Sequence, residues 1–178
     1  MTATADDLRY PVGRFIYDPE ITDEKRRAWA DEIAMMPWRL RAAIVGLNDE
    51  QLATPYRPDG WTVRQVIHHL ADSHLNSYAR FKLALTENNP TIKPYDEAAW
   101  AELPDGREAP IELSLKLLDV LHERWAILLQ SFRPADWERT FTHPERGKMT
   151  LSETLQLYVW HGRHHIAHIT SLRERRHW

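Results

Sequence analysis

Apolar residues recur at every third or fourth position in four segments of the chain, a spacing that predicts amphipathic helices. Two of these segments open with a capping box, Thr62–Gln65 and Thr150–Glu153, in which the first and last residues can cap each other's backbone. The expected helices begin near residues 22, 62, 110 and 150, and the second and fourth run to about residues 87 and 173. Their apolar stripes are Trp29, Ile33, Met36, Leu40 and Ile44; Val63, Val66, Ile67, Leu70, Tyr78, Phe81 and Leu85; Leu113, Leu117, Leu121, Trp125 and Leu128; and Leu151, Leu155, Tyr158, Ile169 and Leu172.

Four long amphipathic segments without an internal repeat predict an all-α protein built as a four-helix bundle. We expect one domain over residues 1–178, with residues 1–21 as an extended N-terminal arm. Residues 89–109 are too long and too aromatic for a plain turn, so we expect an ordered crossover or pocket wall between the second and third helices. Pro37 lies inside the first segment and predicts a kink there.

The composition narrows the chemistry that the chain can use. It has 178 residues, no cysteine and a formal net charge of −3. Without cysteine, any bound metal must be held by nitrogen and oxygen ligands. The interspersed charges form no basic patch, and we expect no nucleic-acid partner. No apolar run approaches the roughly 20 residues of a membrane span and no secretory signal opens the chain, so we expect no membrane partner and a cytoplasmic location.

Histidines gather in two short stretches. Of the ten histidines, seven lie in 68–74 and 161–168. Imidazole nitrogen is a common ligand of zinc, nickel, copper and iron, and two histidines four residues apart share one helix face. The two stretches therefore predict a metal site that uses both helices.

Helical periodicity selects some of these histidines and leaves others open. His161 and His165 continue the inward stripe of the last helix, whereas His164 and His168 fall on another sector. On the second helix, His74 lies in the apolar stripe, His69 lies on its polar shoulder, and His68 points furthest from the expected core. Periodicity alone does not choose between His69 and His74 as a third ligand, and His74 also fits an ordinary buried imidazole.

Several stretches resemble the DinB superfamily, and within it the YfiT-like metal-dependent hydrolases, which are also described as bacillithiol-transferase-like. The resemblance covers nearly the whole chain and is far more specific than two histidines spaced by four. The matching stretches are Tyr10–Gly13, Thr54–Arg57, Gly60–His74, Asn76–Lys82, Pro94–Glu97, Tyr158–His161 and His165–Thr170.

The resemblance implies a ligand set and an assembly. In this family, a histidine that precedes an apolar residue on the second helix joins two histidines spaced by four on the last helix, which implies His69, His161 and His165 here. We expect one divalent ion per chain, with zinc favoured by availability and nickel as the alternative. The resemblance also implies a homodimer, for which the arm segment Tyr10–Ile16 is a candidate contact unless it packs on its own bundle.

Other residues are weaker candidates. Asp72, Asn76 and Arg80 follow His69 at helical spacing and could line the pocket. Asp72 or Glu153 could orient a ligand imidazole through a carboxylate. Two tryptophans, Trp100 and Trp160, lie in segments that could border a cavity. The sequence names no general base.

Three functions fit this site. The first is hydrolysis of a small substrate by a metal-activated water, because an ion held by three neutral imidazoles keeps its charge and open coordination positions. The second is transfer of a low-molecular-weight, bacillithiol-like thiol to an electrophile. The third is a metal-binding or stress protein without turnover.

Overall fold

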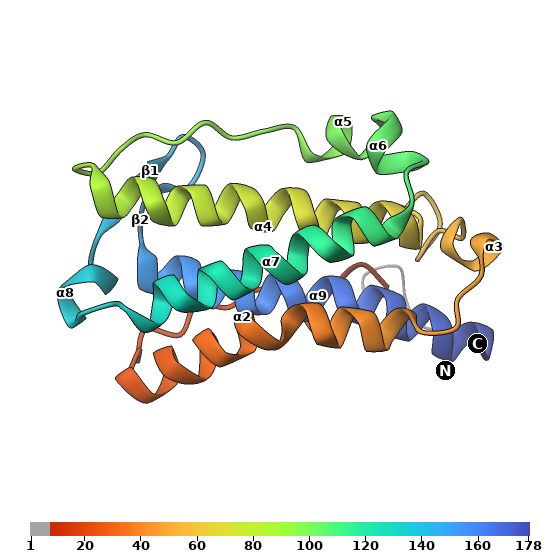
Figure 1. The fold of residues 1–178 in the computed structure, drawn as a ribbon, viewed down its shortest axis with the longest axis horizontal. Helices are drawn as coiled ribbons and strands as arrows, with labels where there is room; N and C mark the ends of the chain where they lie inside the picture. Colours follow the sequence, from red (N-terminus) through yellow and green to blue (C-terminus); the bar gives the residue numbers. More distant parts are fainter. Residues whose placement is uncertain (1–7) are drawn as a thin grey trace.

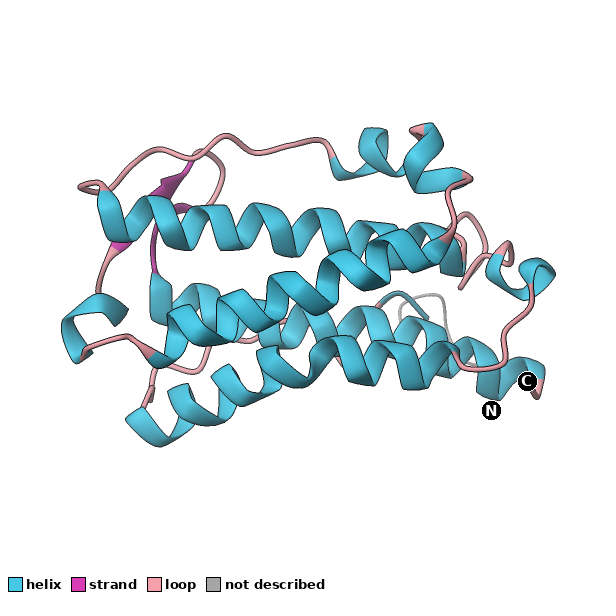
Figure 2. Ribbon diagram, viewed as in Figure 1, coloured by secondary structure: helices cyan, strands magenta, loops and turns pink. Residues whose placement is uncertain are grey.

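The computed structural model describes residues 8–178, so the first seven residues of the predicted arm lie outside the described part. Four long helices form the body of the molecule, and their arrangement is drawn in Figures 1 and 2. They are α2 (Asp23–Ile44), α4 (Val63–Thr86), α7 (Ile111–Gln130) and α9 (Leu151–Arg176). The predicted all-α four-helix bundle is confirmed.

The helices pair in an order set by the long crossover. Helices α2 and α9 run in one direction along the bundle, and α4 and α7 run in the opposite direction (Figure 1). Helix α2 packs against α7 and α9, and α4 packs against the same two helices. Because α4 and α7 are parallel, the chain between them must return along the whole length of the bundle.

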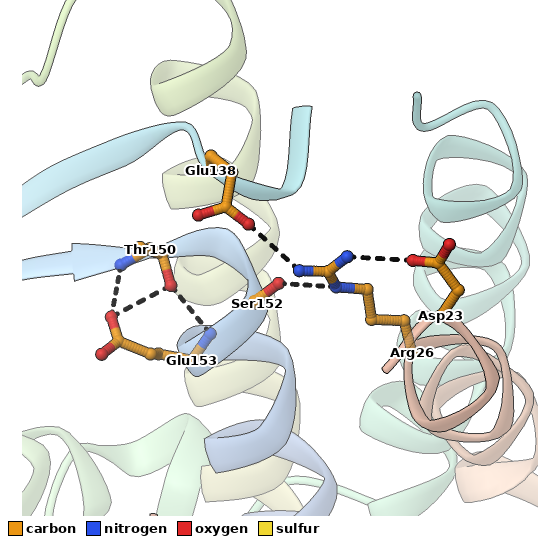
Figure 3. Close-up of polar contacts among 6 residues, drawn as sticks. All are labelled: Asp23, Arg26, Glu138, Thr150, Ser152 and Glu153. Carbon is orange, nitrogen blue, oxygen red and sulfur yellow. Dashed lines mark hydrogen bonds and ion pairs between the residues drawn. The ribbon is translucent and has the colours of Figure 1, made fainter. Parts of the chain in front are cut away.

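The helices begin where their caps satisfy free backbone N–H groups. The Thr22 hydroxyl accepts from the backbone N–H of Lys25 at the start of α2. Both predicted capping boxes form, and Figure 3 shows the one on α9, where Glu153 Oε2 accepts from the Thr150 backbone N–H at 2.7 Å. Beside it, Arg26 of α2 donates to Ser152 Oγ at 3.0 Å, so α2 and α9 are joined at their N-terminal ends.

The crossover is ordered, as expected, and contains α5 (Glu97–Ala101) and α6 (Pro104–Arg107). A short antiparallel hairpin, which the helical periodicity did not predict, consists of β1 (Thr140–His143) and β2 (Gly147–Thr150). Backbone hydrogen bonds from Ile92 to Thr142 and from Thr142 to Pro90 attach the crossover to this hairpin. Two further short helices were also not predicted: α3 (Asp49–Leu52) and α8 (Pro134–Trp137).

The bundle core has two apolar halves. One half contains Leu40, Leu70, Leu118 and Ile169. The other contains Ile33, Phe81, Trp125 and Leu155. Along each of α4, α7 and α9, a buried histidine separates the residues of one half from those of the other. These histidines are His74 on α4, His122 on α7 and His165 on α9. A layer of imidazoles therefore crosses the middle of an otherwise apolar core.

The predicted stripe of α7 was wrong at its N-terminal end. Leu113 and Leu117 are 62% and 43% exposed, and Leu115 and Leu118 are buried in their place. Five of the eight residues 111–118 are apolar and four of them are leucines, so apolar residues fall on two helical faces, and only packing against α2 and α4 selects one. Pro110 is the N-cap of α7, one position before the first turn.

Candidate metal centre

Three histidines from two antiparallel helices converge in the middle of the bundle. His69 lies on α4, and His161 and His165 lie one turn apart on α9. Their potential ligand atoms all lie within 4.8 Å of one another. The Nε2 atoms of His69 and His161 are 3.3 Å apart. The structure therefore places together the three residues that the family resemblance implied.

These three residues fit a divalent ion by geometry and by donor type. Two imidazole nitrogens on one tetrahedral zinc, each at 2.0–2.1 Å from the ion, are separated by about 3.4 Å. The separation of 3.3 Å between His69 and His161 matches that value. Three nitrogen donors, with no protein carboxylate among the described residues in the set, leave coordination positions for other molecules.

Burial keeps the three imidazoles neutral. It lowers the pKa of His69 to about 4, with a smaller contribution from His164. It also holds the pKa values of His161 and His165 well below the ordinary value for histidine. Neutral imidazoles offer the lone pairs that a metal requires, so the site is ready to bind an ion at neutral pH without first losing protons.

The three histidines open onto a surface cleft. One part of the cleft, about 490 Å³, is lined by all three together with Tyr56, Trp61 and Trp160. A second part, about 340 Å³, also reaches His161 and extends between the crossover and the hairpin. Glu97, Arg146 and Trp160 line both parts, so the two spaces meet beside His161. The predicted pocket wall in residues 89–109 is thus present in Pro94–Ala98.

A second histidine group lies beside the first. His164, His165 and His168 also have ligand atoms within 4.8 Å of one another. This group shares His165 with the first, and one neutral imidazole presents a single lone pair, so the two groups cannot each hold an ion through it. His168 Nε2 donates to the Arg9 carbonyl at 3.0 Å, and its ring stacks on Tyr56.

Part of the N-terminal arm packs on its own bundle beside these histidines. The Trp160 indole N–H donates to the Gly13 carbonyl at 3.2 Å, and the Phe15 ring lies 5.8 Å from the Trp160 ring. Arg9 and Tyr10 line the cleft. Of the two tryptophans expected near a cavity, Trp160 borders the cleft, whereas Trp100 packs on Tyr95 and is not part of its lining.

Of the three weaker candidates for the pocket lining, only one lies in the cleft. Arg80 lines the smaller part of the cleft, whereas Asp72 and Asn76 line neither part. Among residues 8–178, the Asp72 carboxylate makes no hydrogen bond, and Asn76 donates to the Asp72 backbone carbonyl. Glu153 is used in the α9 capping box. The expectation that Asp72 or Glu153 orients a ligand imidazole is therefore wrong.

The position expected for His68 was also wrong. His68 is buried, and its ring nitrogens lie 2.7 Å from Ser114 Oγ and 3.1 Å from the Ala109 carbonyl. These contacts come from α7 and from the end of the crossover. Helical periodicity ranks positions by the apolar faces of one helix, so it cannot anticipate a polar residue that is covered by a distant segment.

Sequence reasoning missed one buried histidine and undervalued another. His74, which was left as a possible ligand, and His122, which was not considered, are both fully buried. The Nδ1 atom of His74 lies 2.9 Å from the Nε2 atom of His122. A usable signal was present, because His122 lies between Leu118 and Trp125 on the buried face of α7.

The family model described as "DinB superfamily" matches residues 32–169, which is most of the chain and includes His69, His161 and His165. This chain belongs to the DinB superfamily. The match and the predicted resemblance agree.

Individual relatives of this DinB protein extend the likeness over nearly its full length. A protein of Bacillus mycoides (strain KBAB4), named "Putative metal-dependent hydrolase", is 59% identical over 97% of this chain and 99% of its own. A protein of Bacillus cereus (strain G9842) with the same description is 58% identical over the same shares. YfiT from Bacillus subtilis, a solved structure described as a probable metal-dependent hydrolase with an unusual four-helix bundle topology, superimposes with a TM-score of 0.94. It is 49% identical over 97% of this chain and 99% of that one.

In this DinB protein, no helix within the described part of the chain is long and apolar enough to cross a membrane.

Proposed function

We propose that this DinB protein is a metal-dependent hydrolase of a small molecule, with His69, His161 and His165 as the ligands of one divalent ion. The observation that carries the proposal is the convergence of three neutral imidazoles on an open cleft, two of them buried and that of His161 half-buried. The names of the B. mycoides and B. cereus relatives and of YfiT agree with it. When bound, a divalent ion such as zinc supplies a Lewis acid that activates water and polarises a substrate oxygen.

The cleft supplies polar groups that can orient a substrate. Arg80 and Arg146 line its smaller part and make no ion pair or hydrogen bond within residues 8–178. Burial, followed by these two positive charges, lowers the pKa of His143, which lines the same part of the cleft. We propose that Arg80 and Arg146 bind an anionic or carbonyl oxygen of the substrate.

A tyrosine hydroxyl adds a further donor. The Tyr95 hydroxyl is buried near Ser73 on the wall of the cleft, yet it makes no hydrogen bond of normal geometry within the described residues. An unpaired buried hydroxyl is costly unless a ligand pairs with it. Burial raises the pKa of Tyr95, so the group keeps its proton and acts as a hydrogen-bond donor.

The experiment is a turnover screen of tag-free, zinc-loaded protein against chromogenic carboxylic, amide and phosphate esters, with and without an added low-molecular-weight thiol. We expect turnover without thiol, and loss of it in His161→Ala and after chelation. Turnover of electrophiles only when thiol is added would assign thiol transfer instead. A protein that binds zinc but converts nothing in either arm would favour the non-catalytic function.

A further inference from the structure

A continuous chain of imidazoles leads away from the metal centre into the core. His161 Nδ1 lies 3.3 Å from His74 Nε2, and His74 Nδ1 lies 2.9 Å from His122 Nε2. His122 Nδ1 lies 2.5 Å from the backbone carbonyl oxygen of Ile33. Four helices contribute, because Ile33 lies on α2, His74 on α4, His122 on α7 and His161 on α9. Of these four residues, only His161 lines the cleft; Ile33, His74 and His122 do not.

The carbonyl at the inner end is free because of a proline. In an α-helix, the carbonyl of Ile33 would accept from the backbone N–H of residue 37, and residue 37 of α2 is Pro37, which has no N–H. A buried carbonyl without its helical partner needs another donor. His122 Nδ1 occupies that place.

This carbonyl sets the direction of every hydrogen bond in the chain. A carbonyl oxygen only accepts, so His122 Nδ1 must carry a proton, and in a neutral imidazole His122 Nε2 is then an acceptor. His74 Nδ1 must donate to it, which leaves His74 Nε2 as an acceptor. His161 Nδ1 must donate to that atom, and the lone pair of His161 is therefore on Nε2. The reversed arrangement would set a lone pair of His122 against the carbonyl oxygen at 2.5 Å.

The surroundings keep these imidazoles neutral and fixed. His74 and His122 are both 0% exposed, and Trp125 packs on both rings. Their ring nitrogens bond to other imidazoles and to the Ile33 carbonyl, and no carboxylate of the described residues hydrogen-bonds to either ring. A buried imidazolium without a carboxylate partner is strongly disfavoured. Each ring nitrogen of the two residues also has one hydrogen-bond partner, so neither ring can rotate without losing both.

We propose that Ile33, His74 and His122 form a positioning relay that fixes His161 in its Nδ1–H tautomer and aims its Nε2 lone pair at the metal. The relay rests on His161 being a ligand, as proposed above. Ligand histidines in general donate their second ring N–H to a fixed acceptor, and the sequence predicted a carboxylate, Asp72 or Glu153, as that acceptor. Here the acceptor is another histidine, held in turn by a backbone carbonyl.

The tautomers can be read in the metal-free protein. Long-range ¹H–¹⁵N correlation spectra distinguish Nδ1–H from Nε2–H imidazoles, and the Nδ1–H form is the minor one for a histidine in water. We expect the Nδ1–H form for His122, His74 and His161 before any metal is added. An Nε2–H form at any of the three would overturn the proposal. This measurement involves no substrate, so it stands apart from the test of hydrolysis.

Substitution tests whether the relay acts on the metal. In His122→Leu the His74 N–H loses its acceptor, and we expect the zinc Kd, measured by competition with a chromophoric chelator, to rise about 10- to 100-fold. His68→Leu is the matched control, because His68 is also buried and bonded to a backbone carbonyl but lies outside the relay. We expect it to keep the wild-type Kd.

The outcomes separate the relay from the metal site itself. A folded His122→Leu protein with wild-type zinc affinity would exclude the relay while leaving the ligand set intact. Zinc retained by His161→Ala would instead exclude the ligand assignment, whatever the tautomers are. If His122→Leu does not fold, the tautomers of the wild-type protein decide the question alone.

Discussion

The Nε2 atoms of His69 and His161 lie 3.3 Å apart, although the two residues are 92 positions apart in the sequence. Two lone pairs at this distance repel each other unless a proton or an ion lies between them. The bundle is folded so that this pair, with His165, lies at the floor of a cleft. The strongest consequences of the structure therefore concern metal binding.

Removing any one of the three ligands should remove the metal. We expect about one equivalent of zinc per chain in reloaded wild-type protein, and little in His69→Ala, His161→Ala or His165→Ala, since two imidazoles hold an ion far more weakly than three. Elemental analysis after desalting measures this directly. His68→Ala is the control and should keep its zinc. Loss of zinc confined to the control would mean that the ligands are assigned wrongly.

Metal should stabilise the fold, because the three ligands converge only in the native state. At a free zinc concentration 100 times the Kd, the free energy of unfolding should rise by about 2.7 kcal/mol. For a chain of this size that corresponds to a Tm increase of about 5–10 °C in thermal denaturation. Chelation should reverse it, and His165→Ala should show no increase. An equal increase in His165→Ala would place the stabilising ion elsewhere.

The orientation of α7 can be tested with two leucines. Leu118 is fully buried and Leu113 is 62% exposed. We expect Leu118→Ala to lower the free energy of unfolding by about 2–5 kcal/mol, because it opens a cavity between α2, α4 and α7. Leu113→Ala should change it by no more than about 0.5 kcal/mol. Urea denaturation of both variants gives the comparison, and equal losses would contradict the observed face.

The Asp72 carboxyl should make stability depend on pH. Burial, with a contribution from Asp105, raises its pKa to about 6 from 3.8. Because the folded protein then holds the proton more tightly than the unfolded chain, this group lowers stability as pH rises from about 4 to about 6. We expect Asp72→Asn to be more stable than wild type by about 1 kcal/mol at pH 7.5, a value reduced for the partial exposure of the carboxyl.

The same pair of proteins supplies the control for that prediction. Near pH 3.5 the carboxyl is protonated in the folded protein and largely so in the unfolded chain, so Asp72→Asn and wild type should have nearly equal stability. Denaturation at both pH values measures the difference. An advantage of the variant that is the same at both pH values would mean that the charge of Asp72 is not its cause.

Much of the fold was readable from the chain. Four apolar stripes and two capping boxes gave the four long helices, because helix formation and its start signals depend on residues within one or two turns. Family resemblance named His69, His161 and His165, and the structure brings them together. Periodicity alone had chosen His161 and His165, since both lie on the inward face of one helix.

What remained undecided depended on segments far apart in the sequence. The buried face of α7 was ambiguous because apolar residues cover both of its candidate faces. The burial of His68 required the end of the crossover, and the hairpin 140–150 required a partner in the crossover. None of these contacts leaves a periodic trace in the residues that make them.

The sequence by itself determined that this protein is a helical bundle with imidazoles on two helices, because periodicity and ligand type are local properties. Only the tertiary structure decided what each imidazole does. His69, His161 and His165 face a cleft, whereas His74 and His122 link His161 to the Ile33 carbonyl that Pro37 leaves free. The physical reason is that the partner of a buried polar group is set by the packing of four helices at one point, which no single helix encodes.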